Sequence, residues 1–318
     1  MIKGIRFVPR GTKIPFVRSR MIAFVFSTAL MVGSLAAVLG IGLNFGIDFR
    51  GGILIEVRTQ EPANVAEMRT MLDGLSLGEI SLQRFGDDQE VLIRVQRQEG
   101  AEAEQIQAIA AVKQALGDGV EYRRTEFVGP TVGQELIEAG ILAIGLALLS
   151  ILVYIWFRFE WQFGVGAIVA LSHDIISTLG LFALIQHEFN LATVAAVLTI
   201  AGYSINDTVV VYDRVRENLR RYKTMPLVEL FELSVNETLS RTTMTSLTTL
   251  LALASIYVFG GPVLADFALA MIWGIVIGTY SSVFIAVPLL LYTSLRRGGD
   301  NDVDQALVPE YERTEPGS

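Results

Sequence analysis

Six long apolar stretches constrain this chain more than any other feature of its sequence. A helix needs roughly 17 to 25 residues to cross a hydrocarbon core about 30 Å thick, and each stretch is long enough. Because a backbone in lipid must satisfy its own hydrogen bonds, the sequence predicts a polytopic α-helical membrane protein with six transmembrane helices. The predicted spans are 21–43, 137–157, 163–185, 190–212, 242–260 and 265–292.

The composition agrees with this class and excludes several others. Hydrophobic residues make up 52% of the chain and charged residues 18%, against roughly 25% charged residues in soluble domains. Without cysteine there is no disulfide, thiolate zinc site or cysteine nucleophile. A net charge of −8 argues against nucleic acid as a partner. We find no nucleophile–base set, phosphate loop or metal cluster, so we expect no enzyme activity, cofactor or bound metal.

Lys and Arg predict the orientation, since they stay on the cytoplasmic side of short loops. They are absent from the loops 186–189 and 261–264. We therefore expect both termini in the cytoplasm and residues 44–136 outside. A signal peptide has an apolar run of only about 7 to 15 residues, so 21–43 is expected to remain as a membrane helix. The positively charged segments are 1–20, Arg158, 213–241 and Arg296–Arg297.

The segments outside the spans divide into four parts. The external segment 44–136 alternates short strand patterns with helical ones in the order βαββαβ, which predicts an α+β domain of the ferredoxin-like type. Residues 1–20 form a basic cytoplasmic N-terminus. Residues 225–239 read as an amphipathic cytoplasmic helix within the predicted helical region 137–292. Residues 293–318 form an acidic cytoplasmic tail.

Two glycine-containing junctions connect the external domain to the membrane. The first is Asp48-Phe49-Arg50-Gly51-Gly52 and the second is 128–133. Glycine permits backbone conformations closed to other residues, so both junctions are candidate hinges. The alternative is that they only turn the chain at the membrane surface.

Charged side chains inside the spans are the candidate functional residues. One such charge costs at least about 2.5 to 3.5 kcal/mol in a membrane helix. Asp207 is the sharper candidate, with the polar Tyr203 and Asn206 nearby. Arg241 begins the next predicted span from the same membrane side. A protonatable carboxylate beside a mobile cation can alternate between loaded and unloaded states, so the pair is a candidate proton relay.

Other polar groups allow two readings each. Thr245 and Thr249 follow Arg241 on one helical face and either order water for proton transfer or hydrogen-bond between packed helices. His173 and Asp174 are adjacent in the third span, where neighbouring side chains point about 100° apart. Because His187 is placed at the far end, a metal site is disfavoured, and a polar brace or a helper in proton transfer remains.

Four segments resemble the SecD/SecF family of bacterial export proteins, which is similar to the resistance-nodulation-division transporters. Asp48-Phe49-Arg50-Gly51-Gly52 is similar to the D-F-x-G-G motif that follows the first helix in that family. The other three are Ser172-His173-Asp174, the segment 202–218, and Ser240-Arg241-Thr242, which resemble SecF-type segments. The resemblance runs through residues 21–292 in the family's order.

The resemblance implies a role in protein export across the bacterial inner membrane. A SecF-type subunit pairs with SecD and uses the proton-motive force to draw polypeptides through the SecYEG channel. It also implies YajC and SecA-dependent preproteins as further partners, and H⁺ as the coupling ion, with Na⁺ left open. Two alternatives remain: a non-conducting scaffold of the export complex, and a small-molecule efflux protein, which the small external domain disfavours.

Overall fold

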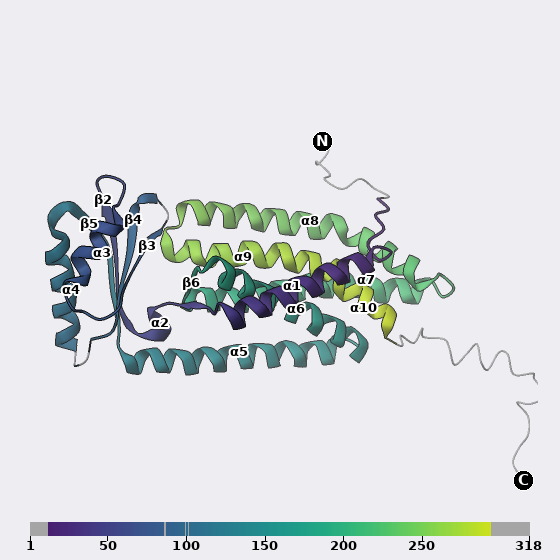
Figure 1. Cartoon of the computed structure of the whole chain (residues 1–318). Helices are drawn as coiled ribbons and strands as arrows, with labels where there is room; N and C mark the ends of the chain where they lie inside the picture. The colour runs from purple at the N-terminus through teal and green to yellow at the C-terminus, as the bar shows by residue number, and fades with distance from the viewer. Residues whose placement is uncertain (1–11, 86, 99, 101, 294–318) are drawn as a thin grey trace, which may run out of the picture.

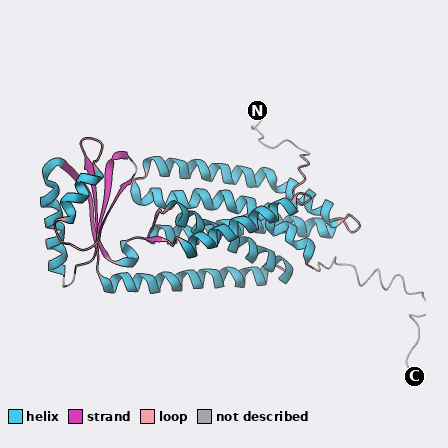
Figure 2. Ribbon diagram, in the orientation of Figure 1, coloured by secondary structure: helices cyan, strands magenta, loops and turns pink. Residues whose placement is uncertain are grey.

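The computed structural model describes residues 12–85, 87–98, 100 and 102–293. An α+β domain sits at one end of a long helical bundle (Figure 1). The predicted acidic tail lies outside the described residues except for Thr293, as does the predicted basic N-terminus up to residue 11. Figure 2 shows that the strands belong to the α+β domain and to one small pair beside it.

Within the described residues, six helical segments are long and apolar enough to cross a membrane. This confirms the predicted number of spans. The last helix continues through a π-helical turn, Ser282–Ala286, into the short α10, Val287–Leu289, and a 3₁₀ turn, Leu290–Tyr292. The six helices are α1 (Arg20–Gly40), α5 (Pro130–Arg158), α6 (Trp161–Ile185), α7 (Leu191–Arg221), α8 (Leu227–Phe259) and α9 (Pro262–Ser281).

Helix α8 differs from the sequence-based expectation. The segments 225–239 and 242–260, expected as a surface helix and a separate span, are one continuous helix of 33 residues. Neither Gly nor Pro interrupts it between residues 227 and 259, so the backbone hydrogen bonds continue. Helix α7 likewise runs past the predicted end at 212 to Arg221. The extensions pack together, and the Asn218 amide donates to Ser234 Oγ over 2.9 Å.

Helices α6, α7 and α9 form the centre of the bundle, and α1, α5 and α8 lie around them. In the spanning windows, 67% of the residues are buried in the last segment and none in α5. Small residues allow the central helices to approach closely. A Cβ on Gly274 of α9 would overlap with the side chain of Ile200 of α7. A bulkier residue there would separate the two helices.

The α+β domain has the predicted element order βαββαβ. Its sheet runs β3-β4-β2-β5 with every neighbouring pair antiparallel. Ile55 lies opposite Ile93 on one side and Thr125 on the other. The elements are β2 (Gly52–Thr59), α3 (Val65–Asp73), β3 (Ile80–Phe85), β4 (Asp87–Val95), α4 (Glu102–Leu116), a 3₁₀ turn (Gly117–Gly119) and β5 (Val120–Val128).

One face of the sheet carries the helices and the other faces the bundle (Figure 1). Ile53, Ile55 and Val57 pack with residues of α3 and α4 into the core of the domain. Between the domain and the bundle lie helix α2 (Ile47–Arg50) and the parallel pair of β1 (Asn44–Phe45) with β6 (Glu188–Phe189). Two-residue strands leave no periodic pattern, so the sequence did not predict this pair.

Candidate functional site

Two carboxylates lie buried within the membrane helices. Asp174, in the middle of α6, has no exposed surface, and Asp207, in α7, is 6% exposed. Both were predicted as candidates from their position in apolar helices. The groups around them differ, and these differences define what each carboxylate can do.

Asp207 joins three elements of the bundle. Thr242 of α8 donates its hydroxyl to Oδ1 over 2.9 Å. Ser282, the first residue of the π-helical turn, donates to Oδ2 over 2.9 Å. A change in the charge of Asp207 therefore alters hydrogen bonds to α8 and to the end of α9 together.

Asp174 is held by side chains of its own helix, α7 and α9. Ser204 and Ser281 donate hydroxyls to Oδ2 over 2.6 and 2.7 Å. His173 Nδ1 lies 3.0 Å from Oδ1. Gly278 of α9 packs closely on α7 here, since a Cβ there would lie 3.3 Å from Ser204 Cβ. This carboxylate links all three central helices.

The π-helical turn connects the two carboxylates. Ser281 and Ser282 are neighbours in sequence, yet one binds Asp174 and the other binds Asp207. Side chains one residue apart on a helix diverge by about 100°, so this segment lies between the two acids. π-helical turns often mark functional sites. The sequence analysis missed both serines, although a Ser-Ser pair inside an apolar helix was a visible signal.

Arg241 lies on the exposed side of α8, next to Thr242. Its guanidinium has no hydrogen bond or ion pair to any described residue, although its charge acts on Asp207. The structure thus brings Asp207 together with the helix of Arg241 and leaves the two charged groups apart. A long arginine side chain can reach inward or turn back to the interface.

The other predicted polar residues of this region make no hydrogen bond to Asp207 among the described residues. Thr245 and Thr249 donate to the carbonyl oxygens of Arg241 and Thr245 in their own helix, over 3.1 and 2.8 Å. Asn206 is exposed. The Tyr203 hydroxyl is buried without a hydrogen-bond partner. The proposed role of Thr245 and Thr249 in proton transfer stays a prediction.

His173 is buried next to Asp174. While Nδ1 faces the carboxylate, Nε2 is buried without a hydrogen-bond partner. The imidazole ring lies 6.1 Å from the ring of Tyr280, whose hydroxyl is 2.9 Å from Ser27 Oγ of α1. These contacts tie α6 to α1 and α9, as a polar brace does.

The first glycine junction is docked against the bundle. Asp48 Oδ2 accepts a hydrogen bond from Leu191 N, at the first turn of α7, over 2.8 Å. An anion at this position is stabilised by the helix dipole. Phe49 stacks on Phe189 with ring centroids 6.0 Å apart. Asp48 thus connects the junction to the helix that carries Asp207.

The two glycines of the junction are required by the backbone. Gly51 and Gly52 have φ values of +71° and +121°, which favour glycine. A Cβ on Gly52 would lie 2.7 Å from the carbonyl oxygen of Val95. The hinge role of Asp48, Phe49, Gly51 and Gly52 stays a prediction.

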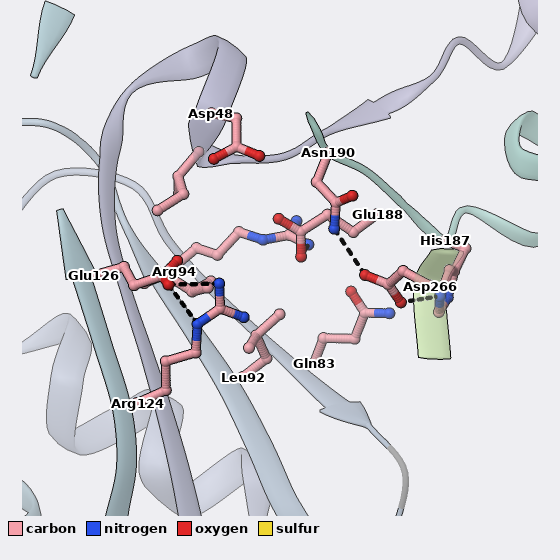
Figure 3. A pocket seen from close by; sticks show the side chains of 12 residues that line it. Asp48, Gln83, Leu92, Arg94, Arg124, Glu126, His187, Glu188, Asn190 and Asp266 are labelled. Atoms are coloured by element: carbon pink, nitrogen blue, oxygen red, sulfur yellow. Dashed lines mark hydrogen bonds and ion pairs between the residues drawn. The ribbon is translucent and has the colours of Figure 1, made fainter. Parts of the chain in front are cut away.

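A small polar pocket of about 60 Å³ lies between the sheet and the α6–α7 connection (Figure 3). Arg94 of β4 forms an ion pair with Glu188 over 2.6 Å. Asp266 of α9 accepts from the Asn190 amide over 2.7 Å, and His187 Nε2 lies 2.6 Å from it. The Arg94–Glu188 pair ties the domain to the bundle, and the contacts of Asp266 fix the α6–α7 connection to α9. No local pattern predicts these contacts, because the partners lie far apart in the chain.

Comparison with known proteins places these sites in one family. The profile of the protein-export membrane protein family SecD/SecF, C-terminal, matches residues 108–296. That of the SecD/SecF GG motif matches residues 36–63. A protein translocase subunit SecF from Cereibacter sphaeroides is 49% identical over 93% of this chain and 94% of its own length. The chain belongs to the SecF branch of the SecD/SecF family.

Other relatives agree with this assignment. A SecF subunit from Rickettsia rickettsii is 45% identical over 91% of this chain and 94% of its own length. The crystal structure of SecDF from Thermus thermophilus, a translocon-associated membrane protein, is similar with a TM-score of 0.82 and 35% identity over 90% of this chain. This chain covers 39% of that longer chain.

A SecDF structure in a super-membrane-facing form is also similar to this chain. It gives a TM-score of 0.65 at 31% identity over 95% of this chain and 41% of its own length. The GG-motif match includes Asp48, Gly51 and Gly52, and the C-terminal match includes Asp174, Asp207 and Arg241. The two buried carboxylates, Arg241 and the first glycine junction therefore lie inside the matched regions.

Proposed function

We propose that this SecF-family protein works with SecD as a proton-coupled subunit that promotes polypeptide export through SecYEG. The observation that supports it is the placement of Asp207, a buried carboxylate whose two hydrogen bonds reach α8 and the π-helical turn. A carboxylate that binds and releases a proton there changes the contacts between three elements. One charge moved across the membrane yields about 2.3 kcal/mol per 100 mV, which is enough to bias such a change.

Arg241 supplies the second part of the proposed cycle. When Asp207 is ionised, its charge attracts the guanidinium, which has no partner among the described residues and can turn inward from α8. When Asp207 is protonated, that attraction is lost and Arg241 returns to the interface. Each proton that binds and leaves thus moves α8 relative to α7.

Helix α7 is the proposed route from this site to the α+β domain. It carries Asp207, and its first turn holds Asp48. A helix of 31 residues is about 46 Å long. A tilt or shift of α7 at Asp207 therefore moves the junction beneath the domain, where an exported chain would be held.

The polar face of α8 supports SecD as the partner. Arg241, Thr245 and Thr248 are exposed within a segment apolar enough to span the membrane. Polar groups in membrane helices face protein or water rather than lipid. The positive charge at the opposite end from the α+β domain supports a cytoplasmic location of both termini in the bacterial inner membrane.

The proposed partners also include SecA-dependent preproteins and YajC, with H⁺ as the coupling ion. A non-conducting scaffold remains the second candidate, because the guanidinium of Arg241 stands apart from Asp207. The two functions differ in whether the charge of Asp207 is needed. A scaffold keeps its activity when an amide replaces that carboxylate.

The test is SecA-dependent export into inverted vesicles that contain SecD and SecYEG, with and without a proton-motive force. Asp207→Asn should abolish the stimulation by that force while the complex with SecD stays assembled. Asp213→Asn is the matched control, since Asp213 lies on the same helix but pairs with Arg158 at the bundle end, over 2.6 Å. Full stimulation in the assembled Asp207→Asn complex would overturn the proposal and favour the scaffold.

A further inference from the structure

An apolar groove opens beside helix α5, close to the α+β domain. Its volume is about 360 Å³. Ile137, Gly140 and Ile141 of α5 form one wall. The opposite wall consists of aromatic side chains from β1, α2 and β6, namely Phe45, Phe49 and Phe189, whose ring centroids lie 5.8 to 6.0 Å apart.

Helix α5 is the least buried of the spanning helices, and its groove-lining Ile137 and Ile141 are exposed, so we expect the groove to face lipid. None of the residues in the spanning window of α5 is buried, and Figure 1 shows the helix along the edge of the molecule. Its first turns hold it in place. A Cβ on Gly133 would lie 3.5 and 3.6 Å from the carbonyl oxygens of Asp48 and Phe49. The residues of α5 that line the groove begin one helical turn after Gly133, at Ile137.

A single cation lines the groove. Arg50 is exposed at the end of α2, and its side chain has no hydrogen bond or ion pair to any described residue. It lies at the end of the spanning helices that carries the α+β domain, which is the level of the lipid phosphates. A guanidinium matches the geometry of a phosphate group and can bind it through two parallel hydrogen bonds.

The groove is short and lined by apolar side chains. Ile137 to Ile144 of α5 line about 10 Å of its length, which equals two helical turns. A flexible hydrocarbon chain can lie along this length between the isoleucines of α5 and the phenylalanine rings.

We propose that this groove binds one acyl chain of a glycerophospholipid whose phosphate is held by Arg50. The occupant would pack on Phe49, which belongs to the GG junction. The lipid would thereby support the joint between α5, α2 and the α+β domain. This site is separate from the Asp207 region and does not depend on proton coupling.

Photolabelling of the complex with SecD in phosphatidylethanolamine bilayers tests the acyl-chain part of the proposal. The probe is phosphatidylglycerol with a diazirine in its acyl chain, and labelled peptides are identified by mass spectrometry. Labelling should concentrate on residues 137–144 and 45–49. Gly140→Leu, which fills the groove, should lower it at least fivefold. Gly145→Leu is the matched control: both glycines have open space where a Cβ would lie, but only Gly140 lines the groove.

A separate pair of probes tests whether Arg50 binds the lipid phosphate. Arg50→Gln should lower labelling by phosphatidylglycerol at least threefold and leave labelling by a diazirine diacylglycerol, which has no phosphate, unchanged. Arg97→Gln is the control, since Arg97 is exposed nearby but does not line the groove. Equal loss with both probes would refute the role of Arg50.

Two results would overturn the groove as a lipid site. Equal labelling of the Gly140→Leu and Gly145→Leu proteins would mean that only the general lipid surround is detected. The chain has no cysteine, so Ile141→Cys introduces a single thiol. Efficient crosslinking of this thiol to a SecD helix would show that protein occupies the groove.

Discussion

Asp174 and Asp207 are both aspartates in the centre of a membrane bundle, but they lie in different surroundings. Asp174 is fully enclosed, with three polar groups around its two oxygens. Asp207 retains slight exposure and accepts two hydrogen bonds, and Arg241 on the next helix has no ion pair to any described residue. The comparison teaches that burial alone does not identify a coupling residue. A carboxylate that must exchange a proton needs partners that can move.

The largest expected effect that separates the two acids is on stability. Asp174→Ala removes the acceptor for Ser204, Ser281 and His173 at the contact of the three central helices. Leaving buried donors unsatisfied costs about 1 to 3 kcal/mol each. We expect a loss of about 3 kcal/mol in the free energy of unfolding, measured by denaturant titration of the purified protein in detergent.

The matched variant for that comparison is Asp207→Ala, which removes the acceptor for two hydroxyls instead of three polar groups. We expect it to lose about half as much stability as Asp174→Ala. Equal losses would contradict the distinction between an enclosed brace and an accessible carboxylate.

A smaller effect should distinguish Ser281, the last residue of α9, from Ser282, the first residue of the π-helical turn. Each substitution to Ala removes one hydrogen bond to a charged acceptor, worth about 1.5 to 3 kcal/mol when buried. Ser281→Ala should mainly lower stability, because its partner is Asp174. Ser282→Ala should mainly lower the stimulation of export by the proton-motive force, because its partner is Asp207. Thermal stability and vesicle export are measured on both variants. Equal losses of stability and of stimulated export in the two variants would contradict the distinction between the serines.

The smallest effect concerns a third buried carboxylate, outside the membrane. Glu56 of β2 is 3% exposed, and burial, followed by the negative charge of Glu90, raises the pKa of Glu56 above 4.5. Between the unfolded and folded pKa values the folded state binds more protons, so stability falls as pH rises through this window. Glu56→Gln should remove that fall and stabilise the sheet at pH 8 but not at pH 4.

Hydrogen exchange of the β2 amides, converted to opening free energies at each pH, checks this prediction. Asp87→Asn serves as the control, because Asp87 is exposed on β4. A pH dependence that persists unchanged in Glu56→Gln would mean that another group causes it.

The sequence predicted the fold where its signals are local. Six apolar runs predicted the six spanning helices. The alternation of strand and helix patterns predicted the order of the elements in the α+β domain. The continuous α8 was missed because the polar run from Ser240 to Thr243 resembles a boundary, although its hydroxyls can bond to the helix itself. The β1–β6 pair was missed because strands of two residues are too short to show an alternating hydrophobic pattern.

The sequence also predicted some residues of the candidate site and missed others, because only local signals can be read from it. Asp174 and Asp207 stand out as charges in apolar helices, so sequence alone selects them. Their partners Ser281 and Ser282 are 75 or more residues away, and nothing in the local pattern assigns each serine to a different acid. The separation of Arg241 from Asp207 depends on a rotamer, which sequence does not encode. The roles of the two carboxylates therefore come from packing.

The measurement that most directly tests the coupling role of Asp207 is ion-driven export in proteoliposomes containing this protein, SecD, SecYEG and SecA. A pH gradient and a Na⁺ gradient are imposed separately on the unaltered protein and on Asp207→Asn, each purified as an intact complex. We expect the pH gradient, and not the Na⁺ gradient, to stimulate export by the unaltered protein. This stimulation should be lost in Asp207→Asn. Undiminished stimulation of the Asp207→Asn complex by the pH gradient would contradict it.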